Sequence, residues 1–465
     1  MNINLNQRVS DNSILFLSLF IIILILSPIL TIFFENINQK SDYLNFFSSG
    51  EFRSYTMNSI VILIGVLLLT LFLGGVSAYL VSFYEFVGVN FFKYSLLMSF
   101  AIPPYIYAYT LSAFFENFGI AYSLVSFFSE DLSKTLIPKI EPLSGSIISL
   151  SLTLFGYVFI LTRSTFLNQS RDLIEVGKSL GFNNIDTFLK IIIPTARPAI
   201  FIGLSLVAME TLSDFGTVSF FGVSTYTTGI YNSWFIFDDL KTANFLSLFL
   251  IFFILFFFGL ECISRKNIKF FNSNNSFNKK NKKVILSGYK SFFAFFFCFF
   301  LFSTSFLFPL VLMLKWSLMN SGYLDLNQIL QLNYNSIKLI FLSSIFIILT
   351  SLIVTFSGRV LKSKILSFFS SLSISGYAIP GIVVSVSVIS LFSLIDSFLD
   401  MNLRGFFIGS IYGLIFGYSV RFFSISFNTI KTVYLKINKS IDESALLLGF
   451  NKLSILKNVH YPLLK

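Results

Sequence analysis

Ten apolar stretches, each long enough to cross a lipid bilayer, constrain this chain more than any other feature of its sequence. A helix needs about 20 residues to span a hydrocarbon core of about 30 Å. Lipid offers the backbone no hydrogen-bond partners, so a spanning segment must be a helix or part of a closed barrel. Because the alternation of barrel strands is absent, we predict an all-α, polytopic helical membrane protein. The stretches cover residues 14–34, 58–83, 91–115, 143–166, 196–220, 243–264, 291–315, 336–358, 365–395 and 405–430.

The composition agrees with a membrane location. Of 465 residues, 55% are hydrophobic and 12% are charged, and the mean hydropathy is +0.81. These values lie outside the range of soluble domains. A net charge of +11 would suit a nucleic-acid-binding protein, but the Lys and Arg residues lie almost entirely in short segments between apolar stretches. We therefore expect membrane lipid as the surroundings of the chain, and no nucleic acid partner.

The charges between the apolar stretches predict the orientation of the chain. Basic and acidic connections alternate along the sequence, and residues 265–290 carry eight Lys or Arg residues without an Asp or Glu. Basic connections stay on the cytoplasmic side. We predict a multi-pass protein of the inner or plasma membrane, with its N-terminus in the cytoplasm.

Short sequence landmarks repeat along the chain. Asn58-Ser59-Ile60 matches Asn335-Ser336-Ile337, and Ala101-Ile102-Pro103 matches Ala378-Ile379-Pro380, in both cases 277 positions apart. A third segment, beginning at Glu175, matches one beginning at Glu443, 268 positions apart. Six predicted spans separate the members of each pair, so both members face the same side of the membrane. The pattern indicates two parallel repeats.

The repeat divides the sequence into three parts. We predict a first half at 1–264 with about six transmembrane helices, a basic cytoplasmic linker at 265–290, and a second half at 291–465 with about four. After Pro194 the first half continues through two more spans, whereas the sequence stops three residues after Pro462. The second repeat is therefore expected to be incomplete at its C-terminus, with its last two helices missing.

One pattern of residues follows the fourth and the tenth apolar stretch. It consists of a glutamate, a small residue, a glycine and a proline at matching spacing. The small residue permits close packing, glycine can end a helix, and proline suits the first turn of the next helix. We predict a short helix on the cytoplasmic surface that is joined to two spans and can transmit force. The residues are Glu175, Gly177, Gly181 and Pro194 in the first copy, and Glu443, Ala445, Gly449 and Pro462 in the second.

This pattern resembles the EAA loop of importer permeases of the ATP-binding-cassette (ABC) class, although Val176, Gly177 and Ser444 depart from the usual residues. In that family the loop docks into a cleft of the ATPase subunit, whose closure on nucleotide moves the membrane helices. The resemblance implies the type I ABC importer permease fold, a cytoplasmic ABC ATPase dimer as partner, and one coupling loop for each ATPase protomer.

The chain has no nucleotide site of its own by sequence. It lacks the G-x-x-x-x-G-K-[ST] loop that binds phosphates. We therefore expect a transporter subunit rather than an enzyme, with no cofactor in this chain and ATP used by the partner. The cysteines, Cys262 and Cys298, have no metal or redox spacing and are predicted to be packing residues in the lipid phase. His460, the only histidine, is predicted to be a surface contact.

Two acidic residues suggest a path for the substrate. Glu210 and Asp214 lie four positions apart inside the fifth apolar stretch, so we expect both on one helix face. Carboxylates at membrane depth mark a pathway or site by default. The alternative is that they brace neighbouring helices through Ser or Thr hydroxyls.

The segment from Met209 to Gly222, continuing to Thr228-Gly229-Ile230-Tyr231, resembles ferric-iron permeases that carry two fused halves. This resemblance implies ferric iron as substrate, an extracytoplasmic iron-binding protein as a second partner, and Glu210 and Asp214 as transient iron contacts in the translocation path. Oxygen ligands suit a hard cation.

Two alternatives remain open. Permeases of the same class move other small solutes, such as thiamine, sulfate, polyamines or phosphonates. An ion-coupled secondary transporter also uses repeats, broken helices and intramembrane acids. Such a transporter would work without an ATPase, whereas the hypothesis of an ABC permease predicts that the chain co-purifies with one.

Overall fold

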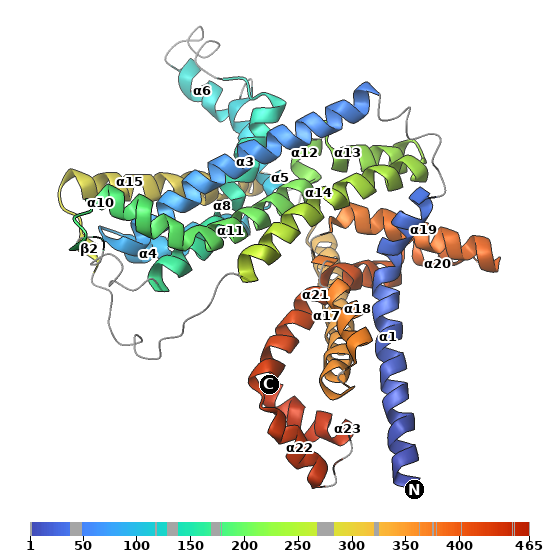
Figure 1. The fold of residues 1–465 in the computed structure, drawn as a ribbon. Helices are drawn as coiled ribbons and strands as arrows, with labels where there is room; N and C mark the ends of the chain where they lie inside the picture. The colour runs from blue at the N-terminus through green and yellow to red at the C-terminus, as the bar shows by residue number, and fades with distance from the viewer. Residues whose placement is uncertain are drawn as a thin grey trace. The chain divides into compact units, whose positions relative to one another are not determined.

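The computed structural model is almost entirely helical (Figure 1). Over the residues it describes, strands occur only as β1 (Tyr84–Glu85) and β2 (Val284–Ile285), which pair in parallel. The fold is therefore of the predicted all-α, polytopic class. The described residues are 2–37, 49–116, 119–127, 138–168, 177, 179–266, 283–319, 325–361, 363–373, 376–377, 379–400, 402–448, 450 and 452–464.

Long helices and short connecting helices follow each other in both halves of the sequence. Those up to residue 266 are α1 (Asn2–Ile37), α3 (Gly50–Phe83), α4 (Val89–Ser95), η1 (Leu96–Ala101), α5 (Pro104–Phe115), α6 (Ile120–Ser126), α8 (Pro142–Asn168), α10 (Asn184–Thr187), η2 (Phe188–Ile192), α11 (Ile193–Ser213), α12 (Gly216–Phe220), α13 (Tyr226–Tyr231), η3 (Asn232–Ile236) and α14 (Leu240–Lys266). Those after it are α15 (Tyr289–Phe302), η4 (Ser303–Leu307), α16 (Phe308–Met319), α17 (Leu326–Leu361), α18 (Lys364–Ser373), α19 (Gly381–Leu399), α20 (Leu403–Phe407), α21 (Ile411–Lys436), α22 (Lys439–Leu447), α23 (Lys452–Ile455), η7 (Leu456–His460) and α24 (Tyr461–Leu464).

Eight helical stretches in the described part of the chain are long and apolar enough to cross a membrane. They overlap eight of the ten predicted spans. Of the other two, the stretch at 91–115 is broken into α4, η1 and α5, and the stretch at 405–430 becomes the 26-residue helix α21. The eight are Asn12–Ile37, Gly50–Phe83, Pro142–Leu167, Phe188–Ser213, Leu240–Leu260, Tyr289–Met319, Leu326–Leu361 and Gly381–Leu399.

The Ala-Ile-Pro motif breaks a helix in each half. The prediction of continuous spans at 91–115 and 365–395 was therefore wrong. Ile102 N–H donates to the Ser99 carbonyl and Ile379 N–H to the Gly376 carbonyl, both at 3.3 Å. Proline has no N–H and disfavours the helical conformation in the residue before it, so a new helix begins after Pro103 and after Pro380.

The internal repeat is visible in the helix boundaries. With the 268-residue shift, α10, η2 and the start of α11 fall on α23, η7 and the start of α24, residue for residue. With the 277-residue shift, the first residue of α5 falls on the first residue of α19. The landmarks found in the sequence therefore mark equivalent structural positions.

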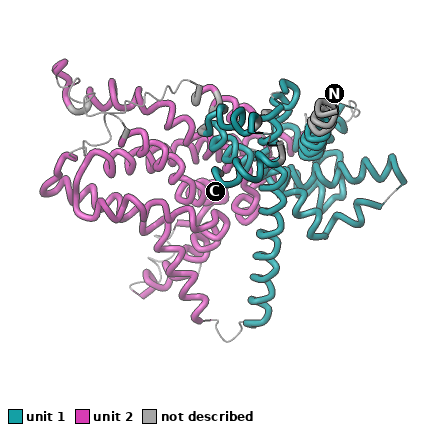
Figure 2. The backbone as a smooth tube through the Cα atoms, turned by 90° about the horizontal axis from the view of Figure 1, so that it is seen from below, with its two compact units in different colours: residues 1–43, 230–251, 325–465 teal, residues 44–229, 252–324 magenta. Residues whose placement is uncertain are grey.

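Two compact units make up the chain (Figure 2). One unit comprises residues 1–43, 230–251 and 325–465, and the other comprises residues 44–229 and 252–324. In the first, α1 packs on α17, α18 and α19, while in the second, α15 packs on α4 and α16 packs on α5. The opening helix of each sequence half thus packs with helices of the other half, so the compact units differ from the division at 264 and 291.

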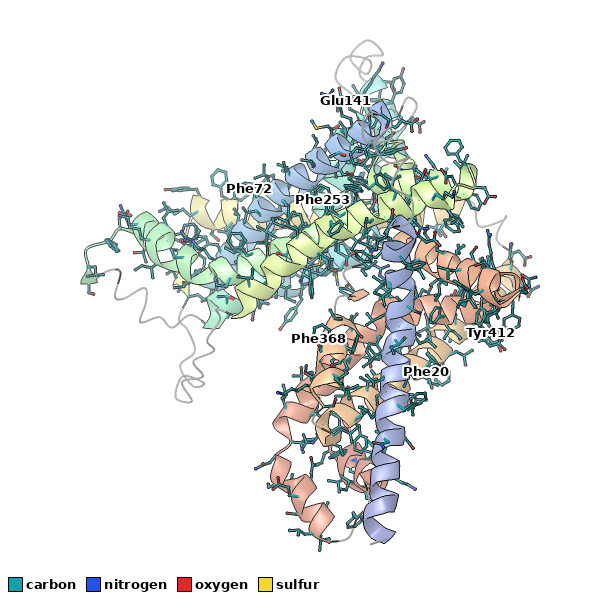
Figure 3. The ribbon with its side chains drawn as sticks, turned by 45° about the vertical axis from the view of Figure 1, so that its right-hand side comes forward. Phe20, Phe72, Glu141, Phe253, Phe368 and Tyr412 are labelled. Carbon is teal, nitrogen blue, oxygen red and sulfur yellow. The ribbon has the colours of Figure 1, made fainter. Side chains whose placement is uncertain are left out.

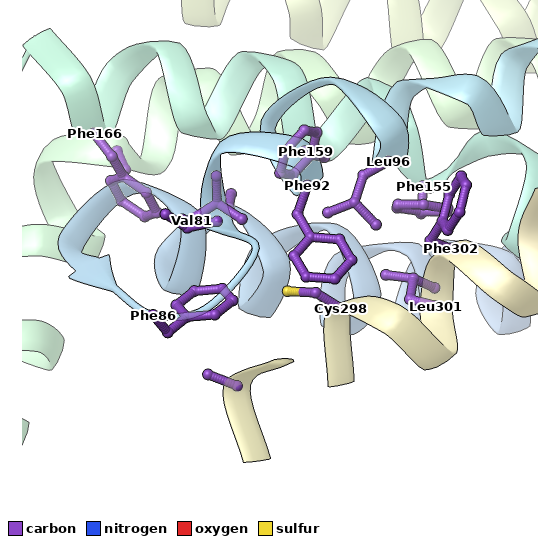
Figure 4. Packing of buried hydrophobic residues seen from close by; sticks show 14 of the residues in the cluster. Val81, Phe86, Phe92, Leu96, Phe155, Phe159, Phe166, Cys298, Leu301 and Phe302 are labelled. Atoms are coloured by element: carbon purple, nitrogen blue, oxygen red, sulfur yellow. The ribbon is translucent and has the colours of Figure 1, made fainter. Parts of the chain in front are cut away.

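The unit of residues 44–229 and 252–324 has a core rich in phenylalanine (Figure 4). Phe92, Phe155 and Phe159 belong to this core together with Cys298, whose side chain is fully buried. Cys298 is therefore a packing residue of the core, on the helical stretch Tyr289–Met319. The side chain of Cys262 lies outside the described residues.

Large apolar side chains also cover the outside of both units (Figure 3). Phe20 and Phe368 on one unit and Phe72 on the other are each more than half exposed. Such a surface is costly in water, but lipid tails are as apolar as these side chains. The exposed aromatic residues agree with helices that face lipid.

Two adjacent glycines in α3 predict opposite effects of the same substitution. A Cβ at Gly74 would lie 2.8 Å from the Phe155 carbonyl oxygen, whereas a Cβ at Gly75 would meet nothing within 4 Å. We expect Gly74→Ala to lower the free energy of unfolding by about 1–3 kcal/mol, because α3 packs closely on α8 there. Gly75→Ala should be neutral or stabilising by up to about 1 kcal/mol. Thermal unfolding of the full chain in detergent measures both, and equal midpoints would contradict the packing.

Candidate functional site

The first predicted loop ends its helix at Gly181. Gly181 has φ of +78°, and Phe182 N–H donates to the Gly177 carbonyl at 3.0 Å. A left-handed glycine followed by this backward hydrogen bond is the usual end of a helix. Pro194 lies in the first turn of α11, as predicted. Glu175 lies outside the described residues.

The second loop repeats this hydrogen bond. Phe450 N–H donates to the Ala445 carbonyl at 3.1 Å, which is the same bond shifted by 268 positions. Gly177 and Ala445 are both buried, and a Cβ at Gly177 would already lie 2.9 Å from Ile191 Cδ1. Gly449 lies outside the described residues, and Pro462 is exposed in α24.

Each loop exposes apolar residues next to its buried small residue. Leu180 is 64% exposed in the first loop, and Leu447 and Leu448 are 90% and 77% exposed in the second. Glu443 is exposed on α22 as well. Both loops lie in basic connections, which are predicted to be cytoplasmic. Lipid therefore does not cover these exposed side chains. Exposed apolar side chains that lipid does not cover are typical of a protein-binding surface.

A buried ionic cluster holds the second loop. Arg359 Nε donates to Asp442 Oδ2 at 2.6 Å, and Asp442 Oδ1 lies 2.8 Å from His460 Nε2. His460 is fully buried, with Tyr434 Oη 3.3 Å from its Nδ1. His460 is therefore part of the interior of the loop, and the prediction of a surface contact was wrong. The cluster joins α22 to α17, α21 and η7.

The charge state of Asp442 follows from this cluster. Burial alone would raise the pKa of its carboxyl, but hydrogen bonds from Arg359 and His460, together with their positive charge, hold the pKa below its ordinary value. A lowered pKa contributes stability that is present above the ordinary value near 4 and is lost as the pH falls through the lowered one. The contact is therefore intact at neutral pH.

An aromatic cluster holds the first loop at the equivalent place. The rings of Tyr79 and Phe188 are 4.4 Å apart, and those of Phe83 and Phe166 are 5.2 Å apart. Phe188 opens η2, the segment that follows the first loop. The two loops thus share their backbone geometry, but different side chains fix them to the membrane helices.

Asp214 is not inside a helix. The span predicted at 196–220 ends at Ser213, so Glu210 and Asp214 do not share a continuous helix face as expected. The Asp214 carboxylate accepts hydrogen bonds from the N–H groups of Thr217 and Val218 at 2.9 and 3.2 Å, and from the Thr217 hydroxyl. It caps α12, which agrees with the bracing alternative for this residue. Glu210 is partly buried on α11.

Removal of the Asp214 cap should lower the stability of the protein. We expect Asp214→Ala to lower the free energy of unfolding by about 1–2 kcal/mol, because the N–H groups of Thr217 and Val218 lose their acceptor. Asp214→Asn keeps an acceptor oxygen and should cost less. Unfolding midpoints of the two variants in detergent check this, and an Asn variant as unstable as the Ala variant would speak against capping.

A cavity of about 410 Å³ lies between α19 and α21. Arg421 lines it, and an ideal Cβ at Gly381, the first residue of α19, would lie 3.0 Å from Arg421 Nη1. Among the described residues, Arg421 Nε has no hydrogen-bond partner. Sequence reasoning missed this residue, although a lone arginine inside an apolar stretch is itself a signal of a functional site.

Comparison with known proteins identifies the class. The described part of the chain has helices long and apolar enough to cross a membrane and two equivalent loops that expose apolar residues, an arrangement that suits a membrane permease. Residues 70–269 match the family described as "Binding-protein-dependent transport system inner membrane component". The chain is a multi-pass permease subunit of the ABC type. Permeases of this family work with an ATPase and a substrate-binding protein.

Individual relatives are distant. The chain is 23% identical over 411 residues to the "Fe(3+)-transport system permease protein FbpB 2" of Haemophilus influenzae, a match that covers 87% of this chain and 75% of that protein. It is 26% identical over 145 residues to the "Probable sulfate transport system permease protein cysT" of Chlorella vulgaris, covering 31% of this chain and 52% of that protein. A third, the "Diacetylchitobiose uptake system permease protein NgcG" of Streptomyces coelicolor, is 21% identical, covering 36% of this chain and 48% of that protein. The last two matches span about half of those relatives.

Proposed function

We propose that this chain moves ferric iron into the cytoplasm by alternating access, powered by a cytoplasmic ABC ATPase dimer and supplied by an extracytoplasmic iron-binding protein. The observation that carries the transport mechanism is the pair of equivalent loops, with the same capping hydrogen bond in each. The iron substrate is supported by the relative named for Fe(3+) transport, which matches over most of both chains. The N-terminus is cytoplasmic in this proposal.

The mechanism uses the loops as levers. Each loop binds one ATPase protomer through its exposed apolar side chains. These are Leu180 in the first loop, and Leu447 and Leu448 in the second. Closure of the ATPase dimer on ATP moves each loop, and the anchored helices move with it. The path then opens alternately to the two sides. In this chain the residues only bind and transmit, and ATP is hydrolysed in the partner.

Glu210 and Asp214 contribute oxygen atoms to the path. Asp214 is occupied by the cap of α12 and holds that short helix in place, so Glu210 on α11 makes the more direct contact with iron. Carboxylate oxygens suit a hard trivalent ion, and a transient site must bind weakly enough to release it.

Uptake of radiolabelled iron tests this role. We expect a Glu210→Gln, Asp214→Asn double variant, assembled with its ATPase, to take up iron at least tenfold more slowly, because both charges are removed while the Asn side chain keeps the cap. Glu141→Gln, at an exposed glutamate, is the matched control and should leave uptake unchanged. Undiminished uptake by the assembled double variant would exclude these residues from the path.

An oxyanion is the second candidate substrate, favoured by the cavity between α19 and α21. The guanidinium of Arg421 lies beside the N-terminal end of α19, and both carry positive charge that favours an anion. Relatives named for sulfate transport agree with this candidate. Uptake assays separate the two: ATPase-dependent uptake of labelled sulfate without uptake of labelled iron would favour the anion, and Arg421→Gln should then abolish the sulfate uptake.

A further inference from the structure

Arg359 occupies a position from which it contacts three parts of the second half at once. It lies in the last turn of α17, and its side chain is only 9% exposed. Its Nη1 donates to the Tyr434 carbonyl at 2.7 Å, and its Nη2 donates to the Ile437 and Asn438 carbonyls at 3.2 and 3.3 Å. These carbonyls end α21, where a positive charge is favourable.

The same guanidinium reaches the loop itself. Its Nε donates to Asp442 Oδ2, and Asp442 in turn contacts His460 on η7. The His460 ring packs edge-on against Phe356 of α17 and Tyr434 of α21. The cluster of Arg359, Asp442 and His460 therefore joins the C-terminal ends of α17 and α21 to the helix α22 and to the segment after it.

The opposite face of α22 is free of this cluster. Asp442 points to Arg359, while Glu443, Ser444 and Leu447 are exposed. One face of a nine-residue helix is thus fixed by a charged joint, and the other is open to a partner. A force applied to the open face reaches α17 and α21 through the joint.

The first half cannot build this joint. With the shifts of the repeat, Arg359 corresponds to Ser82, Tyr434 to Phe166 and His460 to Ile192. None of these side chains carries a charge. Ring contacts such as Tyr79 with Phe188 hold the first loop instead. They oppose separation of the packed segments, but they do not fix the orientation of a helix as the several hydrogen bonds of a guanidinium do.

We infer that Arg359 is a positioning residue that locks the second coupling helix, α22, to α17 and α21, and that the two loops of this chain are therefore mechanically unequal. The lock exists in the chain itself, and only its consequence for transport rests on the proposed function. Loss of Arg359 removes the contact that joins Asp442 to α17 and to the end of α21 and leaves His460 as the remaining partner of Asp442. We therefore expect α22 to be less firmly held.

The experiment measures the lock directly. Spin labels are placed at two exposed leucines, Leu349 on α17 and Leu447 on α22, in the full chain with Cys262 and Cys298 replaced by alanine, in lipid nanodiscs. Pulsed electron paramagnetic resonance then gives the distribution of distances. We expect a narrow distribution in the parent chain and one at least twice as wide in Arg359→Gln. Arg404→Gln removes the same charge from an exposed arginine in α20 and should leave it narrow.

The outcomes separate the inference from the proposed function. An equally narrow distribution in Arg359→Gln overturns the inference. If that variant does not accumulate, Arg359→Lys replaces it: it keeps the charge but loses the fork, and a widened distribution supports the lock while an unchanged one overturns it. With the ATPase bound, Arg359→Gln should hydrolyse at least fivefold more ATP per solute moved. A parent chain that binds no ATPase would defeat the proposed function but leave the distance result standing.

Discussion

Aspartate at both Leu180 and Leu448 should abolish binding of the ATPase to this chain. The two residues occupy equivalent positions in the two loops and are 64% and 77% exposed. Aspartate at these positions should therefore leave the packing of the protein interior unchanged. A leucine buried at an interface contributes about 2 kcal/mol, or about thirtyfold in Kd. The double variant should bind at least a hundredfold more weakly. Titration of the purified ATPase onto the chain in nanodiscs measures this.

Matched controls keep the result specific. Leu124 and Leu399 are also large, exposed residues, at 60% and 59%, but they lie on connections predicted to face the outside. Aspartate at both of those positions should leave the Kd unchanged. If the Leu180 and Leu448 variant binds the ATPase as tightly as the parent chain, the loops are not its docking sites.

Leucine in place of Gly177 should prevent assembly of the complex almost completely. Even a Cβ there would lie 2.9 Å from Ile191 Cδ1 and 3.0 Å from Thr187. The first loop would have to move away from α10 and η2. Overpacking of this kind typically costs about 1–3 kcal/mol, and the loop would also present Leu180 at the wrong place. We expect at least tenfold less ATPase in the complex recovered by affinity purification.

The same substitution at an open position is the control for this loss. Gly75 has no atom within 4 Å of its ideal Cβ, so Gly75→Leu should assemble normally. Ala445→Leu, at the equivalent buried position of the second loop, should resemble Gly177→Leu. Normal assembly of Gly177→Leu would mean that the first loop is not packed as the structure has it.

Local features of this chain could be predicted from its sequence because they depend on neighbouring residues. The apolar stretches, the landmarks of the repeat and the helix end at Gly181 are of this kind, and Gly181 has the positive φ that such an end requires. Pro194 in the first turn of α11 follows in the same way. Each rests on a rule about a few consecutive residues.

Features that depend on distant residues could not be predicted. Burial of His460 is produced by Asp442 and by Arg359, which contacts Asp442 across 83 positions. The packing of α1 on α17, α18 and α19 joins residues more than 280 positions apart, and periodicity says nothing about such pairing. Asp214 was placed inside a span because its apolar neighbours continue past the helix end. Only its hydrogen bonds to Thr217 and Val218 reveal the cap.

Photo-crosslinking from the loops can show whether each loop touches the ATPase. A photoreactive amino acid is introduced singly at Leu180, Leu448, Leu124 or Leu399 of the chain in sealed vesicles, with the ATPase added to the cytoplasmic face. We expect crosslinks to the ATPase from Leu180 and from Leu448, and none from the other two. Absence of crosslinks at both loops, or labelling of both loops by a reagent confined to the outer face, would contradict this expectation.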